Sequence, residues 1–175
     1  MSVEAGQGGD HIDRLREQWQ HELPELDTSP MAVIGRARRI TLRLRPGIEA
    51  VFARHGLDAG EFDVISTLRR SGAPWRLTPT ELYRTLMISS GGLTARLNRL
   101  EAAGLIRRHA AEEDKRSLLV ELTEAGHAKA EVAFREDMEL EKRLLAGLNT
   151  REQAELAALL RKLALSLESE GASTS

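Results

Sequence analysis

The sequence predicts a mainly α-helical protein that contains one small β-hairpin. Apolar residues recur every three or four positions through most of the 175-residue chain, and helix-capping residues precede several of these repeats. The period shortens to about two only between residues 105 and 123. A chain of this length can form one domain with a substantial core, or a compact domain with added dimerisation helices.

The composition excludes several classes of protein. Hydrophobic residues make up 41% of the chain and charged residues 30%, as in ordinary globular proteins. No apolar run approaches the roughly 20 residues that span a bilayer, and no signal peptide is visible, so we expect a cytoplasmic protein without membrane contact. The chain has no cysteine and its five histidines are scattered, so we expect no thiol chemistry, metal or cofactor.

Charge is distributed unevenly along the chain. The formal net charge of −2 argues against indiscriminate binding of nucleic acid. Arginines nevertheless outnumber acids between residues 36 and 54, basic residues gather again between 84 and 116, and acids prevail from residue 121 onward. This sorting is what a protein with one DNA-facing surface requires.

The first part of the chain predicts a disordered start followed by three helices. Residues 1–9 are glycine-rich and polar, which predicts disorder. An added N-terminal helix is expected over 10–24; it carries Trp19 and ends at a proline. A longer dimerisation helix is expected over 28–56, and its apolar residues repeat at helical spacing. A third helix is expected over 59–70.

The next segment predicts two short helices joined by a tight turn. Thr78 is a typical N-cap, the proline after it suits a first helical position, and Glu81 completes a capping box. The second helix is expected within 88–104, with Ser89 or Ser90 as its N-cap and a glycine as its end. Two short helices in this arrangement form a helix-turn-helix.

A β-hairpin follows and turns this unit into a winged helix. Residues 105–109 and 117–123 are expected to form its two strands, joined by a charged turn, so that 57–123 would be a winged helix-turn-helix DNA-binding domain. Two C-terminal dimerisation helices are expected over 124–168. The first would be capped by Thr123 and the second by a capping box of Thr150 and Gln153, and residues 169–175 would form a disordered tail.

The second helix of the pair has two distinct faces. Leu93, Leu97 and Leu100 form one apolar stripe. The opposite face is small and polar, and it suits the major groove of DNA. In isolation the segment is better explained as an ordinary capped amphipathic surface helix, but its neighbours reverse that preference and favour DNA reading. The expected DNA-reading residues of this helix are Ser89, Ser90, Gly91, Thr94, Asn98 and Arg99.

The order of these elements resembles that of the multiple antibiotic resistance regulator (MarR) family. The most specific matching segments are LTPTEL, SSGGLTARLNRLEAAGLIRR and DKRSLLVELTEAG. The resemblance implies a homodimer that binds double-stranded DNA at a pseudo-palindromic operator. It also implies that Arg116, together with Lys115, enters the minor groove while Asp114 holds Arg116 in place. The prolines usual near the wing tip are replaced in this sequence.

The added N-terminal helix is similar to that of the urate-responsive PecS- and HucR-like branch of the family. The resemblance implies an effector site made of Trp19, Asp63, Arg96 and Arg108. At about 100° per residue, Arg96 flanks the apolar stripe and should point toward the protein body, where its charge needs an acidic partner. Asp63 is the partner that the resemblance implies. A purely structural pair of Asp63 and Arg96, without a ligand, is the alternative.

These observations predict a homodimeric, ligand-responsive transcriptional repressor that a small anion releases from its operator. Urate or a related purine is the expected effector. The alternatives are a regulator of the same fold that responds to a phenolic carboxylate or another anion, a constitutive DNA-binding regulator, and a helical interaction module. An enzyme is not expected, because the sequence contains no nucleophile–base pair, phosphate loop or metal cluster.

Overall fold

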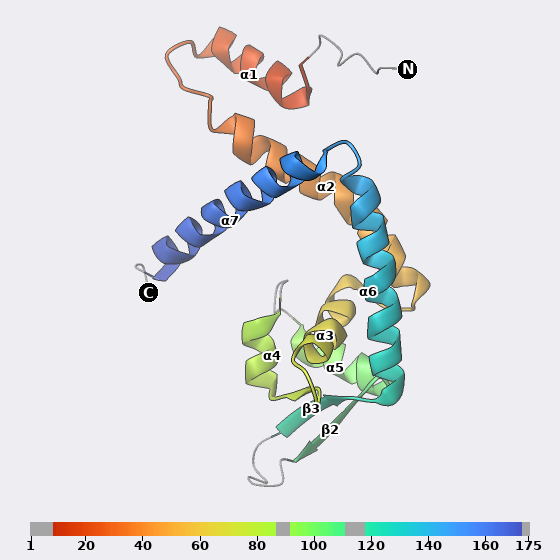
Figure 1. Ribbon diagram of the computed structural model, residues 1–175. Coiled ribbons are helices and arrows are strands. Elements are labelled where there is room, and N and C mark those ends of the chain that lie inside the picture. Colours follow the sequence, from red (N-terminus) through yellow and green to blue (C-terminus); the bar gives the residue numbers. More distant parts are fainter. Residues whose placement is uncertain (1–8, 87–91, 111–117, 173–175) are drawn as a thin grey trace, which may run out of the picture. The chain divides into compact units, whose positions relative to one another are not determined.

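The computed structural model describes residues 9–86, 92–110 and 118–172. Within them, helices and strands follow in this order (Figure 1): α1 (His11–Glu22), α2 (Met31–Arg54), α3 (Ala59–Arg70), β1 (Arg76–Leu77), α4 (Pro79–Thr85), α5 (Leu93–Ala102), β2 (Ile106–Ala110), β3 (Leu118–Leu122), α6 (Glu124–Leu144) and α7 (Thr150–Ala172). The predicted fold class, mainly helical with a small β wing, is confirmed. The chain forms two compact units, Met1–Glu49 and Ala50–Ser175, and each is described by itself.

In the first unit, α1 is fastened to the beginning of α2. Asp10 caps α1 and forms a capping box with Asp13. The Arg36 guanidinium on α2 bonds to both carboxylates, with Nε 2.8 Å from Asp10 Oδ2 and an NH2 nitrogen 2.6 Å from Asp13 Oδ1. Mainly because of the Arg36 hydrogen bond, the pKa of Asp10 falls to about 2. Ile12 is buried against Gly35, so apolar contact and ion pairs hold the same two helices together.

The core of the second unit is built around α3, which packs against α4, α5 and α6. Val64, Ile65 and Leu68 on α3 are fully buried. Phe62, also on α3, stacks on Phe52 at the end of α2 with ring centroids 4.0 Å apart. Residues from the other elements complete this core: Leu82, Leu97, Leu100, Ile106, Val120, Ala130 and Ala133.

Local capping motifs set the beginnings of the helices in this unit. The capping box of Thr78 and Glu81 at α4 and the Thr123 cap at α6 are both present as predicted. A further capping box, which the sequence analysis did not identify, joins Asp58 and Glu61 at the start of α3. Each motif satisfies backbone N–H groups that have no partner inside the helix.

The wing is a three-stranded antiparallel sheet in the order β1-β3-β2. The predicted hairpin is β2 paired with β3, with Ile106 opposite Leu122 and Ala110 opposite Leu118. Strand β1 was not predicted, because two residues are too few to display a period of two. It adds to the far side of β3, where Arg76 lies opposite Glu121.

Two predicted helix starts are wrong, and so is one predicted end. The N-cap of α5 is Gly92 rather than Ser89 or Ser90; its φ of +79° is one that glycine adopts without strain. At α7 the capping box is formed by Asn149 and Glu152, with Asn149 Oδ1 accepting from the Glu152 N–H at 3.0 Å. Asparagine is a stronger N-cap than the predicted Thr150.

Helix α7 ends later than the sequence predicted. It continues to Ala172, beyond the expected end near residue 168, and residues 173–175 of the expected disordered tail lie outside the described residues. Backbone hydrogen bonds propagate an existing helix at little cost, even where the apolar repeat has ended. The Gln153 side chain steadies the α6–α7 turn by donating to the Leu148 carbonyl oxygen at 2.9 Å.

Candidate nucleic-acid interface and effector site

The exposed face of α5 carries two of the predicted DNA-reading residues. Leu97 and Leu100 are buried, and Thr94 and Asn98 on the opposite side are exposed. The N-cap of α5 is Gly92, which has no side chain to bond to the N–H groups of the first turn. Six further predicted contacts, near the start of α5 and at the wing tip, lie outside the described residues: Ser89, Ser90, Gly91, Asp114, Lys115 and Arg116.

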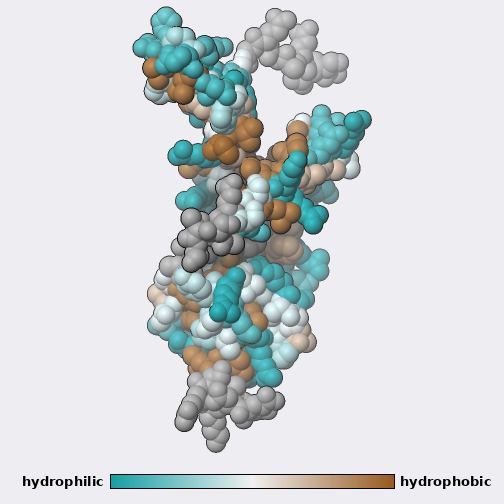
Figure 2. All heavy atoms as spheres, turned by 90° about the vertical axis from the view of Figure 1, so that its left-hand side faces the viewer, coloured by the Kyte–Doolittle hydropathy of each residue, from teal (hydrophilic) through white to brown (hydrophobic). Residues whose placement is uncertain are grey.

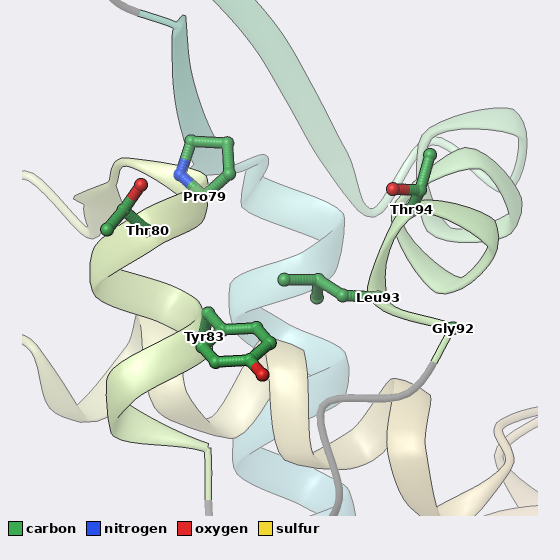
Figure 3. A pocket seen from close by; sticks show the side chains of 6 residues that line it. All are labelled: Pro79, Thr80, Tyr83, Gly92, Leu93 and Thr94. Carbon is green, nitrogen blue, oxygen red and sulfur yellow. The ribbon is translucent and has the colours of Figure 1, made fainter. Parts of the chain in front are cut away.

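An open hollow of about 500 Å³ lies between α4 and the start of α5. Figure 3 shows its six lining residues, three from each side: Pro79, Thr80, Tyr83, Gly92, Leu93 and Thr94. Leu93 extends from the start of α5 toward Tyr83 on α4. Tyr83 is 59% exposed and lines this hollow together with Thr94, so α4 contributes an aromatic ring and a hydroxyl to the same surface. The sequence analysis did not single out Thr80 or Tyr83.

Arg99, the last of the predicted base readers, is engaged within the protein. Its Nε lies 2.5 Å from Glu61 Oε1, and one NH2 nitrogen lies 2.8 Å from Asp58 Oδ2. The hydrogen bond to Glu61 is the main reason why the pKa of Arg99 is raised. In this arrangement the guanidinium faces the first turn of α3 and does not share the face of Thr94 and Asn98.

Arg96 also lies against the first turns of α3. A Cβ added to Gly60 would lie 2.5 Å from Arg96 Cζ and closer still to its Nε, so the guanidinium occupies the space above this glycine. Gly60 and Asp63 are three residues apart and therefore share a face of α3. Asp63 is 5% exposed. The fold thus brings Arg96 to the face of α3 that carries a buried carboxylate.

Arg108 on β2 is bound by Glu101 in the last turn of α5. The Arg108 backbone N–H donates to Glu101 Oε1 at 3.0 Å and its Nε donates to Oε2 at 2.9 Å, while an NH2 nitrogen makes a further bond to Oε2. This hydrogen bonding lowers the pKa of Glu101 and raises that of Arg108. An effector anion at Arg108 would therefore compete with a carboxylate already in place.

Trp19 belongs to the first unit and the other three predicted effector residues belong to the second. On α1 the indole is 47% exposed. Because each unit is described by itself, the meeting of Trp19 with Asp63, Arg96 and Arg108 remains a prediction.

Within the described residues, no group of three or more histidines and acids is arranged to hold a metal ion. Nor does the described part of the chain include a helix with the length and apolarity needed to cross a membrane.

Comparison with known proteins identifies the family of the chain. A family model described as MarR family matches residues 55–117. The HTH-type transcriptional regulator PecS of Dickeya dadantii is 40% identical over 149 residues, which cover 85% of this chain and 90% of that protein. The chain belongs to the MarR family. It is therefore a DNA-binding transcriptional regulator of the winged helix-turn-helix type, and its family is not one of enzymes.

Two solved structures of DNA-binding proteins share this fold. A variant of MarR from E. coli, in complex with operator DNA, superposes with a TM-score of 0.64 at 26% identity; the match covers 83% of this chain and 96% of that one. BpsR of Bordetella bronchiseptica, whose DNA binding is regulated by 6-hydroxynicotinic acid, has a TM-score of 0.62 at 25% identity, with 77% and 94% coverage.

Four carboxylates that the sequence analysis did not consider as site residues form ion pairs with arginines: Asp58, Glu61, Glu101 and, on α1, Asp10. The first two were recognisable, because Asp-x-x-Glu before a helical repeat is a capping-box pattern. No local pattern marks Glu101 as the partner of Arg108, since seven residues and a glycine turn separate them.

Proposed function

We propose that this MarR-family protein is a homodimeric repressor that a small planar anion, urate or a related purine, releases from a pseudo-palindromic operator. In this proposal α5 enters the major groove, where Thr94 and Asn98, with Ser90 and Gly91, read base edges. The N-terminus of α5, where the N-cap is a glycine, suits a phosphate group. Arg116 and Lys115 of the wing would enter the flanking minor groove, with Asp114 positioning Arg116.

Exposed apolar side chains on α2 and α7 support the homodimer. Helix α7 has no buried side chain among its described residues, although an amphipathic helix normally buries its apolar stripe. Five leucines on it are at least 41% exposed: Leu156, Leu159, Leu160, Leu165 and Leu167. On α2, Ile40 and Leu42 are 55% and 70% exposed. Figure 2 shows hydrophobic residues reaching the surface. A second copy of the chain would cover them.

The observation that carries the effector proposal is the position of Arg96 on the Asp63 face of α3. A planar anion could stack on the indole of Trp19 while Arg96 and Arg108 neutralise its charge. The same anion would repel the buried Asp63 carboxylate. Because Arg96 belongs to α5, any displacement of its guanidinium acts directly on the helix that reads DNA. The coupling needed is modest, about 1–3 kcal/mol.

The test is a titration of urate into the complex of the protein with operator DNA, where the operator is the sequence enriched by a genomic selection. The chain has two tryptophans, so a Trp75→Phe background makes Trp19 the only indole reporter. We expect DNA release together with a change in Trp19 fluorescence. The Asp63→Asn variant should bind urate with little DNA release. Flat fluorescence and an intact complex in the wild type would exclude urate.

A second candidate effector is a smaller aromatic carboxylate. The structural similarity to BpsR, which is regulated by 6-hydroxynicotinic acid, favours this class. The same titration with 6-hydroxynicotinate and with salicylate distinguishes it from a purine. A complex that responds to none of these ligands would favour a constitutive regulator.

A further inference from the structure

We propose that Arg99 is a positioning residue that fixes the orientation of α5 on α3, and that it is not a reader of DNA bases. The inference rests on the proposed reading role of α5 for its consequences in DNA binding. Its structural basis is the capping box at the start of α3, which leaves two carboxylate oxygens for a partner from another helix.

The capping box uses one oxygen of each of its two acids. Asp58 Oδ1 accepts from the Glu61 backbone N–H at 2.7 Å, and Glu61 Oε2 accepts from the Asp58 backbone N–H at 2.9 Å. Asp58 Oδ2 and Glu61 Oε1 take no part in these bonds. They are the two oxygens that the Arg99 guanidinium meets.

Arg99 suits this position because its guanidinium is a planar fork. Nε and one NH2 nitrogen bond to different carboxylates at 2.5 Å and 2.8 Å, so one side chain bridges both ends of the capping box. The Glu61 side chain is only 11% exposed, and the Arg99 side chain is 52% exposed. Glu61 is thus largely buried in the protein, and the Arg99 side chain extends from α5 to reach it.

Two arginines of α5 contact the same turn of α3. Arg96 occupies the space above Gly60, and Arg99, one turn further along α5, bonds to Asp58 and Glu61 in the same turn. At about 100° per residue, Arg99 lies roughly 100° from Asn98 and about 140° from Thr94. The contacts of these two arginines therefore determine the direction in which the exposed face of α5, with Thr94 and Asn98, points.

The first unit contains the same arrangement. Arg36 bridges the Asp10 and Asp13 carboxylates of the α1 capping box and so holds α1 on α2. In the described residues, the capping box of α4 differs: the Glu81 carboxylate bonds to the backbone N–H and hydroxyl of Thr78 only. Glu81 therefore offers a matched control, an acid on the helix-turn-helix that no arginine bridges.

Removing the charge of Glu61 should change operator affinity in an unusual direction. Neutralising an acid near DNA normally strengthens binding, because the acid repels phosphates. Glu61→Gln should instead weaken binding to the operator about tenfold, the effect of losing one charge-assisted interaction. Glutamine still completes a capping box, so the start of α3 is preserved. Binding to random-sequence DNA should change little.

The experiment compares operator affinity for Glu61→Gln, Arg99→Gln, their double variant and the control Glu81→Gln. We expect each of the first two to lose affinity. The double variant should bind about as well as Arg99→Gln alone, because the Glu61–Arg99 interaction is already absent in that variant. The control should bind as tightly as the wild type or tighter. Arg99→Lys keeps the charge but cannot bridge both acids, so its operator affinity should lie between those of Arg99→Gln and the wild type.

A base reader would give the opposite pattern. Arg99→Gln would then relax the preference at one base pair while Glu61→Gln left binding unchanged or stronger, and that result would overturn the inference. Hydrogen exchange on the free protein provides a test without DNA. Glu61→Gln should accelerate exchange of the α5 amides and leave exchange of the α6 amides unchanged. Unaltered exchange in α5 would also overturn the positioning role of Arg99. Failure of Thr94→Ala and Asn98→Ala to affect binding would reject only the reading assignment.

Discussion

Glu101, in the last turn of α5, binds the guanidinium of Arg108 on β2 and accepts a hydrogen bond from the Arg108 backbone N–H as well. This pair joins the recognition helix to the wing through side chain and main chain together. It also means that the arginine proposed to bind the effector already has an anionic partner. An anion that takes Arg108 would therefore release the end of α5 from β2.

The first prediction concerns this competition. Glu101→Gln removes the competing charge, so urate should bind about tenfold more tightly, as expected for one charge-assisted interaction. The dissociation constant is measured from Trp19 fluorescence in the Trp75→Phe background. Glu139→Gln, at an exposed position of α6, is the control and should leave the constant unchanged. An unchanged constant in Glu101→Gln would show that the anion does not displace Glu101.

The second prediction uses the space above Gly60. A Cβ at this position collides with Arg96, so Gly60→Ala should lower the melting temperature and weaken operator binding. In an Arg96→Ala background the collision is absent. There, Gly60→Ala should raise the melting temperature, because alanine is favoured over glycine in a helix by up to about 1 kcal/mol. The same sign of change in both backgrounds would contradict the proposed packing.

The third prediction concerns pH and Asp137 on α6. This side chain is buried, one of its carboxylate oxygens has no hydrogen-bond partner within the described residues, and burial raises its pKa to about 6. The repulsion of Glu141 adds to the effect. In the unfolded chain the same group ionises near pH 4. Between these two pH values the folded state holds the proton more tightly, so stability falls as the pH rises through 6.

Asp137→Asn mimics the neutral form of the side chain and should remove the loss of stability above pH 6. We expect the variant to melt at a higher temperature than the wild type at pH 7.5 and to show little difference at pH 4. Thermal melts of the two proteins across this range test the prediction. An equal difference at both pH values would mean that ionisation of Asp137 is not the cause.

The fourth prediction concerns the attachment of α1. Arg36→Gln removes both ion pairs to the α1 capping box, so the amides of His11–Glu22 should exchange faster with solvent. Arg38→Gln, at an exposed position two residues further along α2, serves as the control. If the effector proposal is correct, the Arg36 variant should also respond less to urate, because Trp19 is no longer held in place. Equal α1 exchange in both variants would show that the Arg36 ion pairs do not hold α1 on α2.

The fifth prediction tests the homodimer. Leu160→Glu places a charge on the exposed apolar stripe of α7, where Leu160 is 51% exposed. In a dimer that buries this stripe, an unpaired charge is costly, so sedimentation should show a shift toward monomer. Arg161→Glu, next to it on the polar side, should not change the mass. A variant at Leu160 that remains dimeric would place the interface elsewhere.

Much of the fold follows from local patterns. The N-caps at Asp10, Thr78 and Thr123 and the buried stripe of α3 depend on residues within one or two turns of each other. The errors have local causes too: two capping boxes overlapped near Thr150, and Gly92 starts α5 without a hydrogen-bonding side chain.

The sequence by itself therefore determined the order and type of the elements, the two-faced character of α5, and the arginines available to bind an anion or DNA. The tertiary structure decided what each arginine meets. Arg99 and Arg108 look alike in sequence as basic residues near a reading helix, yet one bridges Asp58 and Glu61 and the other holds Glu101. An ion pair depends on the distance between its two charges in space, and tertiary packing, which no local sequence pattern records, sets that distance.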